Sequence, residues 1–219
     1  MVDLYEAMSS LRAVRRLKPD PIDDDVLERV LQAAAWAPTG GNVQPFRILV
    51  VKDSDKLLKI QHWYYEEWHK YTAVMRKGLD KMPEAAGEAA AKMLKAGDYL
   101  ANHLGEAPAM LIFCFNADHM AITDADLDRP SVVGGGSVYT AVQNTMLACR
   151  AEGLGCVLTT LLCYKEKEVK TLLDIPEEWG TCAHIPIGYP VLKGHGPITR
   201  RPVSKIAYLD SWGNGYQAN

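Results

Sequence analysis

The stretch AMLIFCF, residues 109–115, constrains the fold more than any other part of the chain. All of its positions are apolar, a pattern typical of a β-strand whose two faces are both covered by protein. A strand with one face in water would instead alternate apolar and polar side chains. We therefore predict that residues 109–115 form a central strand in the hydrophobic core.

The flanking segments predict one series of helices and strands. In residues 24–37, apolar side chains such as Leu27, Val30 and Ala34 recur at helical spacing on one face. Ser137 is predicted to cap a further helix, which Gly153 ends. The other helices are expected at about residues 3–12, 54–81, 83–103 and 165–173, and further strands at 46–51, 156–162 and 182–187.

The length of the chain fits a single domain. It has 219 residues, and no Pro-rich, Gly-rich or Ser-rich linker divides the series of elements. Residues 54–103 are helical, charged and aromatic in pattern, unlike the rest. We therefore predict one domain over residues 1–219, with a helical insertion at about 61–106.

The charge balance argues against a nucleic-acid partner. Lys and Arg number 24 and Asp and Glu number 27, with both signs dispersed along the chain, so there is no basic footprint. The N-terminus carries acids where a secretory signal would be basic, and the longest apolar run, residues 107–115, is too short to span a bilayer. Five cysteines without C-x-x-C spacing predict buried, reduced thiols. We predict a cytoplasmic protein without membrane contact.

The usual catalytic motifs are missing from the sequence. It contains no phosphate-binding G-x-x-x-x-G-K-[ST], no strand-linked G-x-G-x-x-G and no G-x-S-x-G. The six histidines form no pair with metal-ligand spacing beside a carboxylate. No metal site is predicted, and phosphate-loop and hydrolase functions are disfavoured.

Two polar features remain that could hold a ligand. The loop APTGGNVQPF, residues 37–46, offers the side chains of Thr39, Asn42 and Gln44 beside two glycines that allow close approach. It is either a site for a flat polar ligand or a polar turn between a helix and a strand. Basic side chains cluster near both ends of the chain, namely Arg12, Arg15, Arg16, Arg200 and Arg201. They either form solvated faces or converge on a phosphate, which guanidinium donors match well.

Three blocks of sequence carry a family resemblance. The opening LRAVRRLKPDPIDDDVLERVLQAAAWAPTGGNVQPFRILVV, the later SVYTAVQNTMLACRAEGLGCVLTTL, and IPIGYP followed by ITRRPVSKI occur in that order. Together they resemble the FMN-dependent nitroreductase family. The resemblance implies an α+β fold with a central, mainly antiparallel sheet flanked by helices. It also implies an intertwined homodimer whose C-terminal extensions are exchanged, which suits the apolar side chains of residues 202–219.

The resemblance also implies a set of cofactor-binding residues. Arg12 and Arg15 fall where the family contacts the flavin phosphate, the ribityl chain and the N1/O2 edge, and Ala13 replaces the usual serine between them. Arg200, with Arg201 beside it, falls where a basic residue meets the phosphate. The remaining positions match residues that lie beside the ring, near its pyrimidine edge or on its opposite side, and they are Pro38, Thr39, Asn42, Gln44, Thr159 and Thr160.

The chemistry that the resemblance implies is hydride transfer by a ping-pong mechanism. NADH or NADPH reduces FMN, and an electron-poor acceptor such as a nitroaromatic or quinone then takes its place. No side-chain acid or base is required, because the flavin carries the difficult step. Alternatives are a related flavin enzyme acting on activated alkenes, halogenated phenols or heterocycles, and a flavin-binding protein without turnover.

Substrate choice is expected to lie in the helical insertion. Glu67 and Tyr71 are four residues apart on one helix face, which is similar to the substrate clamp of iodotyrosine deiodinases, and Trp68 lies between them. The lysine of that clamp is missing from its expected place before Ala107, which argues against deiodination. The aromatic residues here either stack on a planar acceptor or attach the helices to the body of the protein.

Overall fold

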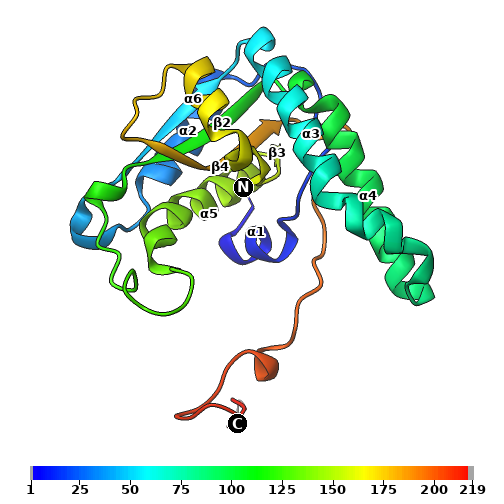
Figure 1. Ribbon diagram of the computed structural model, residues 1–219, viewed down its shortest axis with the longest axis vertical. Helices are drawn as coiled ribbons and strands as arrows, with labels where there is room; N and C mark the ends of the chain where they lie inside the picture. The colour runs from blue at the N-terminus through cyan, green and yellow to red at the C-terminus, as the bar shows by residue number, and fades with distance from the viewer. Residues whose placement is uncertain (1, 217–219) are drawn as a thin grey trace.

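The centre of the fold is a four-stranded sheet. The computed structural model describes residues 2–216 (Figure 1). Its strands are β1 (Phe46–Val51), β2 (Ala109–Phe115), β3 (Gly155–Cys156) and β4 (Gly180–Gly188), in the order β1-β2-β4-β3. Every neighbouring pair is antiparallel. The predicted α+β class and the central position of residues 109–115 are confirmed.

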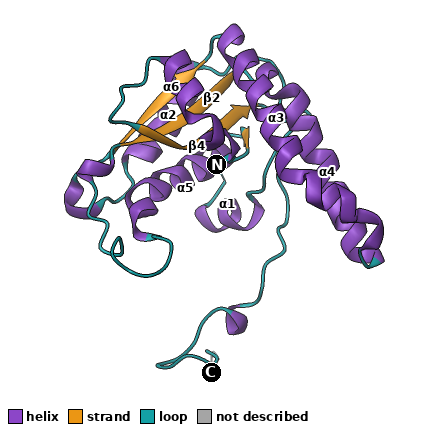
Figure 2. Ribbon diagram, in the orientation of Figure 1, coloured by secondary structure: helices purple, strands orange, loops and turns teal. Residues whose placement is uncertain are grey.

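Helices cover both faces of this sheet (Figure 2). Helices α2 (Asp24–Ala35) and α5 (Gly136–Ala151) pack on one face, whereas α3 (Ser54–Gly78) and α6 (Glu166–Leu173) pack on the other. Alternate side chains of β2 serve the two layers: Leu111 and Phe113 face α2 and α5, and Met110 and Ile112 face the other side. All four are fully buried, which explains why this strand is apolar at every position.

Two long helices form a hairpin that extends away from the sheet (Figure 1). Helix α3 begins after Asp53, whose side chain accepts a hydrogen bond from the Lys56 amide at 2.9 Å. Helix α4 (Glu84–His103) returns alongside α3. The bounds agree with the two helices predicted over residues 54–81 and 83–103.

The predicted strand over residues 156–162 is wrong beyond its first residue. Only Gly155–Cys156 pairs with β4 as a strand, Thr159 makes one further bridge to His184, and Leu161–Lys165 forms a short 3-10 helix. The N-terminal segment also bonds to this backbone, since the Val14 amide donates to the Cys156 carbonyl at 2.9 Å. The apolar sequence of residues 156–162 therefore reflects burial rather than regular pairing.

The predicted cap at Ser137 is also wrong. Helix α5 begins at Gly136, and its N-cap is Gly135, because the 3-10 turn Val133–Gly135 runs directly into the helix. The Ser137 hydroxyl instead accepts a hydrogen bond from the Gly40 amide at 3.1 Å. Gly153 follows the helix at a positive φ of 76°, as the predicted stop requires.

The two terminal segments have little regular structure. Helix α1 is limited to Leu4–Ser10, because Leu11 already has extended backbone angles. The C-terminal tail leaves the body of the chain (Figure 1), and Trp212 is 91% exposed, so the tail does not pack on its own protomer. The end of this tail, residues 217–219, lies outside the described residues, as does residue 1.

Cys163 is exposed, unlike the buried Cys114, Cys149 and Cys156, so the prediction of buried thiols fails at this position.

Among the described residues, no helix combines the length and the apolar character needed to cross a membrane.

Candidate functional site

The N-terminal arginine segment is fixed to the body of the protein by backbone hydrogen bonds. The amide of Val14 donates to Cys156, and the amide of Lys18 donates to Tyr189 at 2.7 Å. The carbonyl of Arg16 accepts from the Val191 amide at 3.0 Å. Residues 12–18 therefore run as an anchored, extended segment, and the arginines that it carries have defined positions.

The two ends of the chain meet beside this segment. Nε of Arg12 donates to the Gly194 carbonyl at 2.6 Å, and the Gly196 amide donates to the Ser10 carbonyl at 3.1 Å. Nε2 of His195 lies 2.8 Å from the Leu154 carbonyl. These contacts hold residues 194–196 beside residues 10–12, although the two segments lie nearly two hundred positions apart in the sequence. Arg200 follows a few residues later.

Arg12, Ala13 and Arg200 line one cavity of about 390 Å³. The other lining residues include Gln143 and Met146 from α5, together with apolar residues such as Val157 and Leu158 that follow β3, and no acidic side chain lines the cavity. Arginines from the two ends of the chain thus line the same cavity. Two guanidinium groups without a carboxylate to neutralise them suit an anionic group.

Arg15 lines a second cavity, of about 300 Å³, which it shares with Arg12 and Ala13. Burial raises the pKa of the Tyr64 phenol on α3, and the Thr159 side chain and the charge of Arg15 partly oppose this shift. Thr159 is buried and its backbone pairs with His184, whereas Thr160 is exposed. Neither Thr159 nor Thr160 lines the cavities of Arg12 and Arg15.

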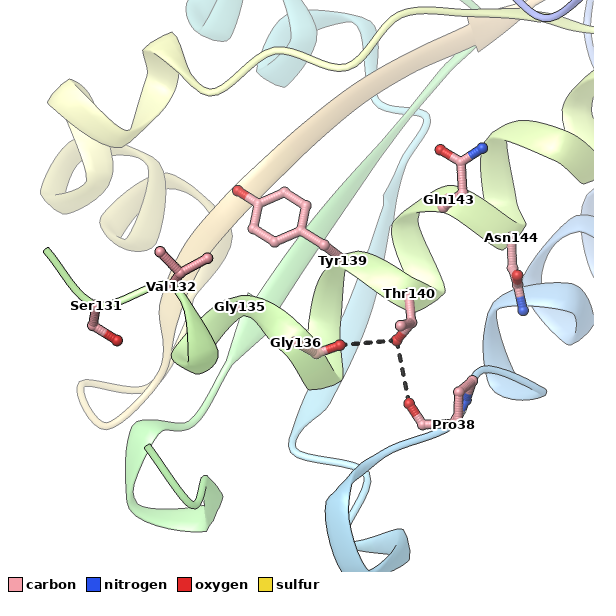
Figure 3. Close-up of a pocket in the computed structure, with 9 residues that line it drawn as sticks. All are labelled: Pro38, Ser131, Val132, Gly135, Gly136, Tyr139, Thr140, Gln143 and Asn144. Atoms are coloured by element: carbon pink, nitrogen blue, oxygen red, sulfur yellow. Dashed lines mark hydrogen bonds between the residues drawn. The ribbon is translucent and has the colours of Figure 1, made fainter. Parts of the chain in front are cut away.

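The polar loop near residue 40 is held by hydrogen bonds to α5. The hydroxyl of Thr140 donates to the Pro38 carbonyl at 3.2 Å (Figure 3), and Thr39 Oγ1 accepts from the Gln44 amide at 3.1 Å. Asn42 and Gln44 both have positive φ, 56° and 53°, which is uncommon for residues other than glycine. Both side chains are exposed, with Gln44 Nε2 3.2 Å from Asn42 Oδ1.

Pro38 also lines a third cavity, of about 750 Å³ (Figure 3). One face of α5 forms its floor, through residues that recur every three or four positions, namely Gly136, Tyr139, Thr140 and Gln143. Burial, followed by the nearby thiols of Cys182 and Cys163, raises the pKa of Tyr139. Gln143 also lines the cavity of Arg12 and Arg200. The α5 face therefore connects the polar loop with the arginine site.

The wall of that cavity is organised by a carboxylate. Asp124 is buried and accepts hydrogen bonds from the amides of Val132, at 2.8 Å, and Val133, from the Ser131 hydroxyl at 2.7 Å, and from Arg129 at 2.8 Å. These donors hold the pKa of the carboxyl well below its usual range, with the Val132 amide the largest cause. Asp124 thus fixes Ser131 and Val132, which line the cavity.

The residues expected to contact substrate have different environments. Trp68 is buried between α3 and α4, and its Nε1 donates to Asp98 at 2.7 Å. Glu67 is buried, and its carboxylate pairs with Lys70 at 2.6 Å. Tyr71 is 64% exposed. Of these three, only Tyr71 has a largely exposed side chain. None of them lines the cavity of Arg12 and Arg200 or the cavity of Arg15, which we call the two arginine cavities.

Sequence reasoning missed several residues of the site. Lys92 lines the cavity of Arg15, and Gln143 and Asp124 shape the cavity of Pro38. Arg16, which the sequence named only as a member of the basic cluster, also lines the cavity of Arg15. The helical spacing of Gly136, Thr140 and Gln143 was a usable signal, since small and polar residues on one helix face indicate an unfilled surface. Lys92 carried no signal, because a lone lysine on a helix is ordinarily solvated. Arg201 is exposed and lines neither arginine cavity.

These features define an α+β protein with basic cavities where its two ends meet. A sequence model described as the nitroreductase family matches residues 9–189. The chain therefore belongs to the nitroreductase family, which confirms the resemblance seen in its sequence. Membership supports an enzyme of the oxidoreductase class.

Individual relatives agree with this assignment. The chain is 32% identical to the 5,6-dimethylbenzimidazole synthase of Rhodospirillum rubrum over 180 residues, 82% of this chain and 78% of that protein. It is 25% identical to an NADH dehydrogenase of Thermus thermophilus, over 94% of this chain and 95% of the relative.

The solved structure of NfrA2 from B. megaterium superposes with a TM-score of 0.67 at 20% identity, covering 95% of this chain and 74% of that one. The NADPH:FMN oxidoreductase of Vibrio harveyi, solved with NAD+, gives 0.65 at 19% identity, with 98% and 79% covered. At this identity, the two structures share the fold.

Proposed function

We propose that this protein is an FMN-dependent NAD(P)H oxidoreductase that reduces an electron-poor acceptor, such as a nitroaromatic or a quinone, by a ping-pong mechanism. The observation that carries the proposal is the cavity of Arg12, Ala13 and Arg200, built from both ends of the chain. A phosphate needs planar, cationic donors, and a flavin ring needs an apolar surface. Arginines and apolar side chains meet in this cavity.

Each residue has a defined part in this proposal. Arg12 and Arg200 would bind the phosphate of FMN, and the positive charge of Arg15 would favour negative charge on the flavin. Val157, Leu158 and Met146 supply apolar contact and exclude water. Bound FMN supplies the hydride chemistry, accepting from the nicotinamide and donating to the acceptor. The protein needs no acid or base of its own for this reaction.

A homodimer is part of the same proposal. Pro38, Thr39, Asn42 and Gln44 lie outside the arginine cavities of their own chain, so these residues would reach a flavin held by the partner. Apolar side chains that a protomer leaves in water support such an interface, since they are costly to expose. They lie on α1 and on the tail and include Tyr5, Met8, Ile206 and Trp212. Tyr71 is proposed as the acceptor contact of the α3–α4 hairpin, with Glu67 and Trp68 supporting it from behind.

The first experiment is the visible spectrum of the purified protein, followed by anaerobic addition of NADH or NADPH. Flavin bands that bleach, and that return when a nitroaromatic or quinone is added, support the proposal. Flavin that neither nucleotide reduces indicates a binding protein without turnover. A protein that stays colourless after incubation with FMN contradicts the cofactor assignment.

A second candidate function is the formation of a heterocycle. The observation that favours it is the 32% identity, over 82% of the chain, to a 5,6-dimethylbenzimidazole synthase. Mass spectrometry of aerated mixtures of the flavin-loaded protein with NAD(P)H tests this candidate. Accumulation of 5,6-dimethylbenzimidazole supports it, whereas no detectable product together with rapid reduction of nitroaromatics favours the first function.

A further inference from the structure

The cavity of about 300 Å³ that contains Arg15 is more basic than a flavin phosphate site requires. Four of its nine lining residues are cationic, and none is acidic. Two of the cations, Arg16 and Lys92, lie outside the residues assigned to the cofactor. The remaining lining residues are small or apolar, namely Ala13, Val14, Ala96, Leu192 and Gly194.

Two separate parts of the fold supply these charges. Arg15 and Arg16 come from the anchored segment near the N-terminus, whereas Lys92 comes from α4 of the helical hairpin. The Arg16 guanidinium lies 3.9 Å from the centre of the Tyr99 ring, also on α4. This cation–π contact holds one cation in place before any ligand arrives.

The charges in this cavity are not neutralised by the protein. None of the ion pairs found among residues 2–216 involves Arg12, Arg15, Arg16 or Lys92. Like charges in one small cavity repel each other, and an anion that enters relieves this repulsion. FMN carries one phosphate, which Arg12 and Arg200 would bind in the neighbouring cavity under the proposed function, so the charges of Arg16 and Lys92 would be left for another molecule.

We propose that Arg16 and Lys92 form a subsite for an anionic group on a reactant that gives hydride to the flavin or takes hydride from it. This inference rests on the proposed function and names its substrate class: a reactant that carries a carboxylate or a phosphate. The group is either the additional phosphate of NADPH or the anionic substituent of the acceptor. A planar guanidinium and an ammonium suit both.

Binding measurements without turnover test the subsite. Isothermal titration of the flavin-loaded protein uses two matched pairs of probes: NADP+ against NAD+, and 4-nitrobenzoate against 4-nitrobenzyl alcohol. For each pair we compare the affinity for the more negatively charged probe, NADP+ or 4-nitrobenzoate, with the affinity for the other. In Lys92→Ala, this ratio is expected to fall about tenfold for at least one pair, the loss typical of one charged contact. A pair that responds identifies the source of the anion.

The control is Lys95→Ala, since Lys95 is an exposed lysine of the same helix that does not line the cavity. It should leave both ratios within twofold of the wild type. Lys92→Glu should lower the responding ratio further, and 0.5 M salt should weaken the charged probes selectively. Equal ratios in wild type, Lys92→Ala and Lys95→Ala overturn the subsite.

The proposed function can fail independently of this inference. A protein that lacks flavin, or whose flavin NAD(P)H does not reduce, contradicts the oxidoreductase proposal. The anion site is judged only by the binding ratios of the variants, which can be measured on the protein with or without flavin.

Discussion

Nε of Arg12 donates a 2.6 Å hydrogen bond to the carbonyl oxygen of Gly194, and this contact joins the two ends of the chain. Arg12 and Arg200 line the same cavity as a result. We therefore expect Arg200→Ala to weaken FMN binding about 10- to 100-fold, the loss expected for one charge-assisted phosphate contact, while the fold is retained. Fluorescence titration with FMN measures the change, and Lys205→Ala in the exposed tail is the control. Unchanged affinity in Arg200→Ala would show that the phosphate lies elsewhere.

His195 is expected to position Arg12. The Leu154 carbonyl can only accept, so Nε2 of His195 carries the proton in their 2.8 Å contact. His195→Ala removes this bond from the segment that holds Gly194, and FMN binding should weaken, whereas His195→Gln retains an Nε2–H donor and should restore it. In an Arg12→Ala background, His195→Ala should have little further effect on FMN affinity. Additive losses in the double variant would separate His195 from Arg12.

Gly97 of α4 is required by the Trp68 ring. A Cβ atom at position 97 would overlap Cζ2 of the Trp68 ring, so Gly97→Ala must displace the indole and break its bond to Asp98. We expect a loss of about 1–3 kcal/mol in the free energy of unfolding, as for other overpacked sites. Gly87→Ala is the matched control in the same helix, because its Cβ would meet nothing closer than 3.7 Å, and helix propensity should make it neutral or stabilising. Urea unfolding compares the two, and equal stabilities would contradict the packing argument.

His184 should make stability depend on pH. Both of its ring nitrogens are buried and have no hydrogen-bond partner among residues 2–216, and burial lowers its pKa from 6.5 to about 4. Between these values the unfolded chain binds a proton at His184 that the folded protein does not. The free energy of unfolding should therefore fall as pH drops from about 6.5 to about 4, by up to ~3 kcal/mol. His184→Leu should flatten this part of the curve and the exposed His119→Gln should not; parallel curves for all three proteins would exclude His184 as the cause.

Asp124 should control the mobility of the cavity wall. Asparagine at this position cannot accept from Val132, Val133, Ser131 and Arg129 together, since its amide has one oxygen. Hydrogen exchange over residues 125–135 is expected to accelerate in Asp124→Asn. Asp126→Asn is the control, because Asp126 lies in the same loop but is exposed. Equal exchange rates in the two variants would indicate that the wall is held by other contacts.

The extent of prediction from sequence differed between fold and site. Strand β1 at Phe46–Val51, the central strand β2 and the helices of the hairpin were predicted nearly to the residue, because their signals are local: short apolar runs for the strands and long charged and aromatic segments for the helices. The strand at residues 156–162 and the Ser137 cap were wrong, since both depended on partners that sequence does not show. The neighbours that decided them were Val14, which bonds to Cys156, and Gly40, which bonds to Ser137.

The sequence by itself determined the family, the α+β class and the types of residue available to bind a phosphate. Only the tertiary structure decided which of those residues act together. Arg12 meets Arg200 because the chain ends are bonded through Gly194, and Arg16 meets Lys92 because a helical hairpin packs beside the N-terminal segment. The physical reason is that apolar periodicity is encoded locally, whereas the approach of charged side chains is set by backbone contacts between distant segments, and a single sequence carries no record of those distances.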